Sequence, residues 1–248
     1  MRPGIVCLSL TLIASVLLSS CGKATGEAGL KVGYGPNGIE RLSFNGLVLE
    51  DLALHPTDAF HIWHMKATTV RGKPVAGRQC EWGEVNKGRR WDAATHIWLY
   101  SFGWGTISLQ FVQKADTLDM HVVEKNNADS GIIFKGATIY PFVLHFPELP
   151  KGFDDASYEH LAVNAGDPVP IADFGASQVS VIADGGSKPL YHGFEPAGGG
   201  NGFFPVISST AMDSMSTAYP KLDRPVGPGA SDSFTVSLRF AGTEPASQ

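Results

Sequence analysis

Alternation of apolar and polar residues with a period of two is the feature that most constrains this chain. In the segment TISLQFVQ (106–113), Ile107, Leu109 and Phe111 alternate with hydroxyl and amide side chains. Successive side chains of a β-strand point to opposite faces of its sheet, so this pattern predicts a strand with one buried and one solvated face. Beyond residue 29 no long apolar segment shows the helical period of 3.6 residues.

Similar strand signals recur at short spacing between turn residues, since the chain holds 29 glycines and 16 prolines. Asn45-Gly46 is the strongest short hairpin signal, and residues 114–117 form a second predicted turn. The predicted strands span residues 38–44, 47–52, 60–70, 95–102, 106–113, 118–124, 132–144, 179–183, 203–207 and 234–240. The pattern therefore predicts an all-β fold, a large twisted antiparallel β-sandwich in a single domain.

The inner faces of this sandwich are predicted from the apolar members of the alternating segments. They are Ile107, Leu109, Phe111, Leu118, Met120, Val122, Phe142, Leu144, Val236, Leu238 and Phe240. The Pro- and Gly-rich stretch 146–175 departs from the pattern, and we expect a helical turn near residues 154–160 within it. Such an excursion either carries function or decorates the surface.

The N-terminus is typical of an export signal. Arg2 precedes an apolar run over residues 5–18, which is too short for a membrane-spanning helix of roughly 20 apolar residues. Leu18-Ser19-Ser20-Cys21 then resembles the bacterial lipobox, in which the cysteine is acylated and becomes the first residue of the mature protein. The alternatives are an ordinary secretory signal with an incidental cysteine, or a short N-terminal anchor.

The lipobox divides the chain into a signal peptide (1–20), a lipidated flexible tether (21–29), a β-sandwich domain (30–240) and a flexible tail (241–248). Gly22 stands where lipoproteins of enteric type carry the aspartate that retains them at the inner membrane. We therefore expect a lipid-anchored protein of the cell envelope, at the periplasmic or surface face of the outer membrane.

The charge balance limits the partners. A formal net charge of −5 gives no electrostatic footprint for nucleic acid or anionic lipid, so membrane attachment would come from acyl chains on Cys21. Cys7 leaves with the signal peptide, and Cys80 then has no cysteine with which to form an intrachain disulfide. Cys80 is either a small buried hydrophobe or a reactive thiol.

Two His-x-Trp pairs, His61 with Trp63 and His96 with Trp98, are the clearest candidates for a binding site. On a strand, each pair places an indole ring and an imidazole on one face. An aromatic face can stack on the C–H groups of a sugar while the imidazole donates to a hydroxyl. The same pairs fit a core face with a satisfied histidine, because large aromatic side chains are mostly buried.

Residues 81–92 add further candidates for the same ligand. Trp82 and Trp91 are possible stacking residues, with Glu84 and Asp92 as polar partners. Carboxylates in this stretch also fit the acid pair of a glycosidase, which requires a separation of about 5–9.5 Å, and they equally fit the charged ends of a hairpin. Residues 191–195 (YHGFE) form a second polar and aromatic cluster.

Metal and cofactor signals are weak. His61 and His64 are three residues apart on a predicted strand, so they point to opposite faces and would not share a metal. The chain shows no zinc-binding, phosphate-binding or dinucleotide-binding motif and no GxSxG nucleophile turn. We therefore expect no metal and no cofactor.

Two segments, 104–111 (WGTISLQF) and 116–126 (DTLDMHVVEKN), resemble a recurring element of galactose-mutarotase-like supersandwich domains. Segments 141–147 (PFVLHFP) and 228–240 (PGASDSFTVSLRF) resemble later elements of such domains. The resemblance spans most of residues 29–240 and implies a β-supersandwich fold. Members of this family occur alone as sugar epimerases and, fused to catalytic barrels, as N-terminal domains of glycoside hydrolases.

The chain departs from the family where catalysis is concerned. The family places a catalytic histidine in a segment whose counterpart here is 136–142 (GATIYPF), which contains none, and its late glutamate base is not recognisable. No catalytic residue is therefore assigned. We predict non-catalytic recognition of oligosaccharides by an envelope lipoprotein; the alternatives are a divergent epimerase or glycoside-hydrolase-related enzyme, and a structural lipoprotein that binds another protein.

Overall fold

The structure is a computed structural model, and it describes part of the chain. The described residues are 28–36, 38–51, 61–70, 73–79, 88–129, 131–146, 160–162, 169–171, 177–184, 188, 190–196, 201–209 and 224–242. At 50, 51, 61–70, 73–79, 135, 160–162 and 169–171 it describes the backbone alone. The elements named in this part of the chain are all strands, β1 to β17.

The strands form three antiparallel sheets. The small sheet has the order β1 (Leu30–Gly35), β2 (Gly38–Phe44), β3 (Leu47–Asp51). The second, named here the β10 sheet, has the order β12 (His160–Ala162), β15 (Tyr191–Pro196), β16 (Gly202–Ser208), β10 (Ile132–Tyr140), β4 (His61–Val70), β5 (Lys73–Gln79), and β11 (Leu144–His145) pairs with β16. The third, the β9 sheet, has the order β13 (Val169–Ile171), β14 (Ser177–Asp184), β17 (Ser231–Gly242), β9 (Thr117–Asn126), β8 (Gly105–Gln113), β7 (Ile97–Phe102), β6 (Arg89–Asp92).

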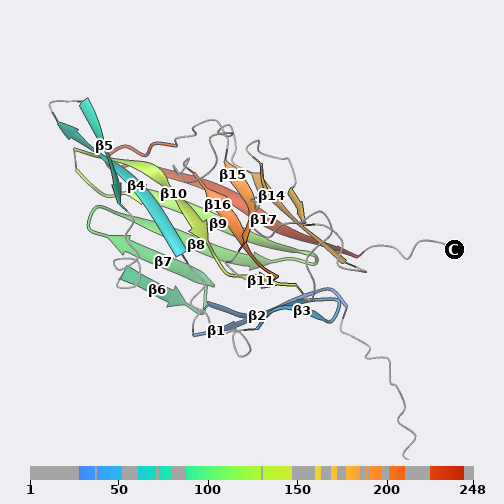
Figure 1. Cartoon of the computed structure of the whole chain (residues 1–248). Coiled ribbons are helices and arrows are strands. Elements are labelled where there is room, and N and C mark those ends of the chain that lie inside the picture. The colour runs from blue at the N-terminus through green and yellow to red at the C-terminus, as the bar shows by residue number, and fades with distance from the viewer. Residues whose placement is uncertain are drawn as a thin grey trace, which may run out of the picture.

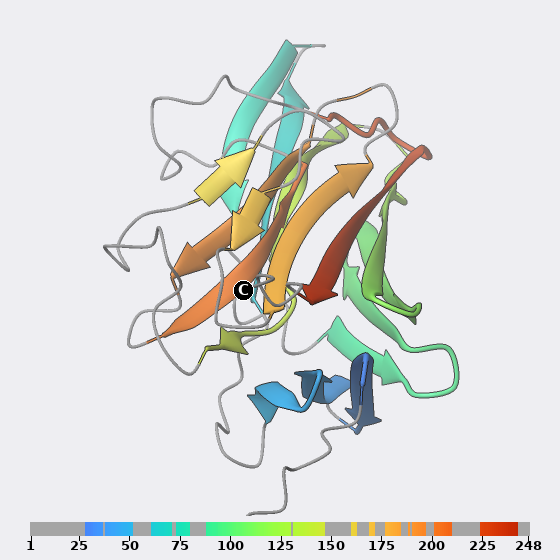
Figure 2. The same cartoon turned by 90° about the vertical axis from the view of Figure 1, so that its right-hand side faces the viewer.

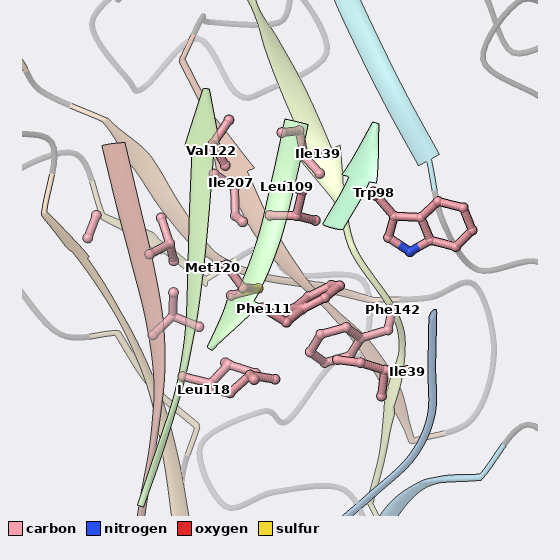
Figure 3. Close-up of a cluster of buried hydrophobic side chains, with 14 of the residues drawn as sticks. Ile39, Trp98, Leu109, Phe111, Leu118, Met120, Val122, Ile139, Phe142 and Ile207 are labelled. Carbon is pink, nitrogen blue, oxygen red and sulfur yellow. The ribbon is translucent and has the colours of Figure 1, made fainter. Parts of the chain in front are cut away.

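The two seven-stranded sheets lie against each other as the layers of a sandwich, and the small sheet lies across one end (Figures 1 and 2). Side chains from both layers form one buried apolar cluster, part of which is drawn in Figure 3. The small sheet adds Ile39 and Phe44 to it, and Phe44 packs on Phe240 of β17 with ring centroids 5.4 Å apart. The predicted all-β sandwich is confirmed.

The predicted core is also confirmed, because each of the eleven apolar residues named from the alternation is buried. In β8 the burial pattern alternates strictly from Gly105 to Val112, as the sequence of that strand predicts. Fully burying one such aliphatic or aromatic side chain contributes about 1.5–3 kcal/mol relative to leaving it exposed. The period-two pattern therefore identified the residues that hold the two layers together.

Most strand ends differ from the predictions by one to three residues, and three differences are described here. The predicted strand 132–144 ends at Tyr140 and resumes as the short β11, because Pro141 has no N–H to donate to the ladder. The strand expected to begin at 95 begins at Ile97, because His96 has a left-handed φ of 54° and belongs to the preceding turn. β17 runs to Gly242, two residues into the predicted tail.

The remaining differences concern short strands. β1, β5, β6, β12, β13 and β15 were not predicted, since most are brief or contain glycine or proline. His160, the last residue of the expected helical turn, begins β12, and residues 154–159 lie outside the described residues.

The predicted signal peptide, Cys21, most of the tether, Cys80 and residues 243–248 lie outside the described residues. Among the residues that are described, no helix is long and apolar enough to cross a membrane.

Candidate functional site

Four of the candidate residues meet where β6 turns into β7. Trp91 and Asp92 end β6, His96 closes the turn and Trp98 lies in β7, where its backbone is directly opposite Trp91. Tyr34 of β1 completes the group from the small sheet. Sequence reasoning missed Tyr34, because its contact with this turn spans two different sheets.

The rings of Tyr34, Trp91 and His96, named here the aromatic group, are nearly parallel. The Tyr34 and His96 rings stack face to face with centroids 3.8 Å apart and planes 12° apart. The ring centroid of Trp91 lies 6.1 Å from that of Tyr34 and 6.2 Å from that of His96, with interplanar angles of 22° and 12°. All three side chains are half-buried, so part of this parallel stack reaches the surface.

Asp92 is used to build the turn. Its Oδ1 accepts a hydrogen bond of 3.0 Å from the N–H of Ala94. The Thr95 side chain, followed by this N–H, lowers the pKa of Asp92 by hydrogen bonding to its ionised form. Asp92 therefore stabilises the turn that precedes His96, and its side chain is exposed to solvent.

Trp98 belongs to the core, the alternative that the sequence also allowed. It is 5% exposed and packs on Trp91 with ring centroids 5.2 Å apart, at the edge of the cluster shown in Figure 3. Arg89 covers its ring at 4.6 Å, and a Cβ on Gly38 would lie 2.6 Å from its indole nitrogen. Trp98 therefore offers no surface for a ligand but supports Trp91 from beneath.

Two polar atoms of the aromatic group have no hydrogen-bond partner among the described residues. The hydroxyl of Tyr34 and the indole nitrogen of Trp91 are both buried and unpaired. Burial raises the pKa of the Tyr34 hydroxyl, so it stays protonated and able to donate. Leaving such a group unsatisfied costs about 1–3 kcal/mol.

The first His-x-Trp pair lies elsewhere, in β4 of the β10 sheet. The backbone of Trp63 is opposite Thr138, and that of His61 is opposite Tyr140. Next to them, Thr138 and Ser208 are buried and joined by a hydroxyl–hydroxyl hydrogen bond of 2.7 Å. The structure thus does not bring the two His-x-Trp pairs into one ladder. Trp82 and Glu84 lie outside the described residues.

The cluster expected at 191–195 is largely internal. Tyr191, His192 and Phe194 of β15 are fully buried. The Nδ1 atom of His192 lies 3.2 Å from the carbonyl oxygen of Leu190, so this histidine is satisfied locally.

Sequence reasoning also missed a buried polar cluster formed by Glu124, Ser209, Arg224 and Asp232. Glu124 of β9 is 0% exposed and accepts a 2.7 Å hydrogen bond from the Ser209 hydroxyl through Oε1. Burial raises the pKa of Glu124 to about 8, against the lowering effect of the Ser209 hydrogen bond. Within the part of the chain that the structure describes, the Oε2 atom of Glu124 has no hydrogen-bond partner.

The other half of the cluster is a charge pair. Arg224 is 2% exposed and donates to both carboxylate oxygens of Asp232, at 2.9 Å from Nε and 3.1 Å from Nη2. It also donates at 2.9 Å to the carbonyl of Lys188, whose ammonium lies 3.5 Å from Asp232. Such two-point recognition is the strong geometry for arginine and carboxylate.

A signal for Glu124 existed in the sequence. Leu118, Met120 and Val122 alternate inward, and the same period places Glu124 and Asn126 on that buried face. A carboxyl at an inward position of a strand indicates either a paired or a neutral buried acid. Its partners come from residues more than 80 positions away, which local patterns do not reveal.

The cluster is not a metal site by composition. Within the described residues, no group of three or more His, Cys, Asp or Glu is placed to hold a metal ion.

The chain resembles known proteins in its fold but not in its sequence. No protein-family model matches the chain, and no curated protein matches it. Among solved structures, a candidate aldose 1-epimerase from Escherichia coli K12 matches with a TM-score of 0.57 and 13% identity, over 87% of this chain and 97% of that chain.

Two further solved structures are more distant in shape. A galactose mutarotase-like protein from Clostridium acetobutylicum has a TM-score of 0.49 and 8% identity, over 88% of this chain and 94% of that chain. A galactose mutarotase related enzyme from Lactobacillus acidophilus has a TM-score of 0.46 and 10% identity, over 90% of this chain and 98% of that chain.

Proposed function

On the galactose mutarotase-like β-sandwich that this chain shares with solved structures, we propose that the protein binds oligosaccharides without transforming them. The observation that carries the proposal is the half-buried parallel stack of Tyr34, Trp91 and His96 with two unpaired polar atoms. The solved structure from Escherichia coli K12 with this fold is named as a candidate aldose 1-epimerase, which agrees with a sugar ligand.

The chemistry of the aromatic group suits a sugar. The exposed part of Trp91 or Tyr34 can cover the C–H face of a pyranose ring, and aromatic side chains are the usual anchors of binding sites. Asp92, ionised and exposed, can accept from sugar hydroxyls at the rim. Trp82 and Glu84 remain candidates for sugar contacts, as do His61 and Trp63, which lie in β4 of the other sheet.

Binding without catalysis is supported by what the described acids do. The one carboxyl with a strongly raised pKa, Glu124, lies inside the core against Ser209 and not beside a histidine. The segment 136–142 lacks the histidine that the mutarotase resemblance requires. Among the described residues Val123 is the large apolar side chain that is mostly exposed, and one such residue does not form a large apolar patch.

A glycan array followed by titration calorimetry tests the proposal. We expect dissociation constants between about 1 μM and 1 mM, equivalent to about 4–8 kcal/mol. Trp91→Leu and Tyr34→Leu keep apolar bulk but remove the stacking face, and each should weaken binding about tenfold. Phe102→Leu is the matched control, because Phe102 is half-buried on the same pair of strands and stacks on Trp104 instead.

The proposal fails if no glycan gives heat, or if Phe102→Leu weakens binding as much as Trp91→Leu does. Polarimetry of an aldose solution tests the enzymatic alternative, since an epimerase would accelerate its mutarotation and a binding protein would not.

We further propose that the protein is an envelope lipoprotein anchored through Cys21, because Leu18-Ser19-Ser20-Cys21 follows an apolar run. Expressed in a bacterium, the chain should partition into detergent and carry acyl chains, and Cys21→Ser should abolish the acylation. An intact mass that shows an unmodified chain cut at another position would overturn this proposal.

A further inference from the structure

β6 ends the β9 sheet, and no other described strand pairs with its far side (Figure 1). An open strand edge can pair with the edge of another chain, and proteins guard such edges with proline or with charges, above all lysine. Among the other edge strands, β13 contains Pro170, β5 begins with Lys73-Pro74 and β3 ends with Glu50-Asp51. β6 contains neither proline nor lysine, and its two exposed charges are of opposite sign.

The direction of the backbone groups in β7 follows from one hydrogen bond. The N–H of Phe111 in β8 donates to the carbonyl of His96 at 3.0 Å, so His96 turns its backbone groups toward β8. In an antiparallel ladder, successive residues of a strand turn their N–H and carbonyl groups to opposite neighbours. Trp98 therefore also faces β8, whereas Ile97 and Leu99 face β6.

The same alternation places the backbone groups of Trp91 at the open edge. Asp92 and Arg90 are opposite Ile97 and Leu99, so their backbone groups bond to β7. Trp91 lies between them and turns its N–H and carbonyl the other way. On that side, main-chain hydrogen bonds can add a strand of another molecule to the sheet.

The charges of β6 match a second copy of the same strand. Arg90 and Asp92 are exposed and, two residues apart, lie on one face. If two β6 strands pair antiparallel with Trp91 opposite Trp91 of the other copy, each Arg90 is directly opposite an Asp92. Directly opposed residues of opposite charge stabilise an antiparallel pair.

The other registers in which Trp91 uses its outward backbone groups are unfavourable. With Trp91 opposite Arg89 of the other copy, the two Arg90 side chains are opposed. A shift in the other direction opposes the two Asp92 side chains. Like charges directly opposite each other are destabilising, so the charges select the register with Trp91 on the two-fold axis.

Both charged side chains can make this contact. The Arg90 guanidinium is exposed, and it makes no hydrogen bond or ion pair with another residue that the structure describes. Asp92 bonds through Oδ1 to the N–H of Ala94. A carboxylate has about four acceptor positions, so it can also accept from an arginine of another copy.

We infer that the protein forms a two-fold symmetric dimer in which β6 adds to β6 of a second copy. Trp91 lies on the axis, and Arg90 of each copy pairs with Asp92 of the other. The inference goes beyond the proposed function and does not depend on it. Side chains of a strand stand roughly perpendicular to the sheet, so pairing along the edge brings two aromatic groups together without covering their faces.

Sedimentation equilibrium of the whole protein, in density-matched detergent because of the proposed anchor, tests the inference. Between about 1 and 300 μM, a range that covers weak complexes, the mass should rise from that of a monomer to that of a dimer. Arg90→Glu opposes two acids in the selected register and should weaken the dimer at least tenfold. Arg239→Glu is the matched control, because Arg239 is exposed on β17, a central strand of the same sheet.

A mixture of two variants tests the register. Asp92→Arg alone opposes two arginines and should also weaken the dimer. Mixed with Arg90→Glu, it places opposite charges at both contacts, so the mixture should dimerise although neither variant pairs with itself. Asp92→Arg also removes the hydrogen bond to Ala94, and circular dichroism checks its fold; Arg90→Glu leaves that turn intact.

Three results would overturn the inference. The first is a monomer at every concentration. The second is a dimer that Arg90→Glu leaves unchanged, since that dimer would use another surface. The third is an equal loss with Arg239→Glu, which would show an effect of net charge and not of β6.

Discussion

Gly136→Ala should be strongly destabilising for two reasons that a matched variant can separate. Gly136 lies in β10 at a register shift opposite β4 and has a φ of 126°, a conformation that other residues rarely adopt. Forcing alanine into such a region costs about 1–3 kcal/mol. In addition, its Cβ would lie 2.6 Å from the Oγ, 2.7 Å from the carbonyl oxygen and 2.9 Å from the carbonyl carbon of Ser209.

The clash is with backbone, so rotating a side chain does not relieve it. Moving Ser209 away would stretch its hydrogen bonds with Ala137 and Glu124, both buried. Each buried group left unsatisfied costs about 1–3 kcal/mol. Together with the backbone strain, the expected loss in the free energy of unfolding is about 3–6 kcal/mol.

Gly229→Ala is the matched control. Gly229 has a φ of 72°, but a Cβ there would meet nothing within 4 Å. This variant should lose only about 1–2 kcal/mol, the cost of a left-handed conformation for an ordinary residue. Urea unfolding followed by tryptophan fluorescence measures both. Equal losses for the two variants would refute the reasoning, because they would show that contact with Ser209 contributes nothing.

Three further variants test the packing and charges. The pKa of Glu124 is near 4.5 in the unfolded chain and about 8 in the folded protein. The free energy of unfolding should therefore fall as the pH rises between these two values, by roughly 5 kcal/mol, and then level off. Glu124→Gln should lack this fall when urea unfolding is repeated at each pH, and an unchanged slope would contradict the assigned burial. Arg224→Met removes both hydrogen bonds to Asp232 and should lower the free energy of unfolding by about 3–5 kcal/mol. Adding Asp232→Asn to the same chain should restore part of this loss. A loss below about 1 kcal/mol in calorimetric unfolding would show that the pair contributes little to stability. Leu109→Ala empties a fully buried position and should cost about 2–5 kcal/mol in the same experiment, whereas a surface position would cost almost nothing.

Much of the fold could be predicted because one period governs it. In β8 and β17 the alternation names the buried residues without any knowledge of their partners. Strand ends were less predictable, since they depend on local exceptions. Pro141 cannot donate to a ladder, and His96 adopts a turn conformation that favours glycine or asparagine.

The candidate site was less predictable, because its members meet through tertiary contacts. Trp91, Asp92, His96 and Trp98 are close in sequence, and the hairpin between β6 and β7 brings them together as expected. Tyr34 joins them only because the small sheet closes that end of the sandwich. Which tryptophan is covered also depends on that sheet, since Gly38 of β2 lies against Trp98.

The position of β17 has a consequence for how the chain acquires its structure. Among the described strands β17 is the last along the chain, but it lies inside the β9 sheet, between β14 and β9 (Figure 2). Until it is made, β14 and β9 have no common neighbour, and each presents an unpaired edge that can pair with another molecule. Such long-range pairing makes folding slow, so we expect the β9 sheet to be completed only after Ser231–Gly242 has been synthesised. An unfolded chain can pass through a narrow translocation channel, and the proposed export would exploit this delay; conversely, a chain cut before Ser231 would aggregate rather than fold.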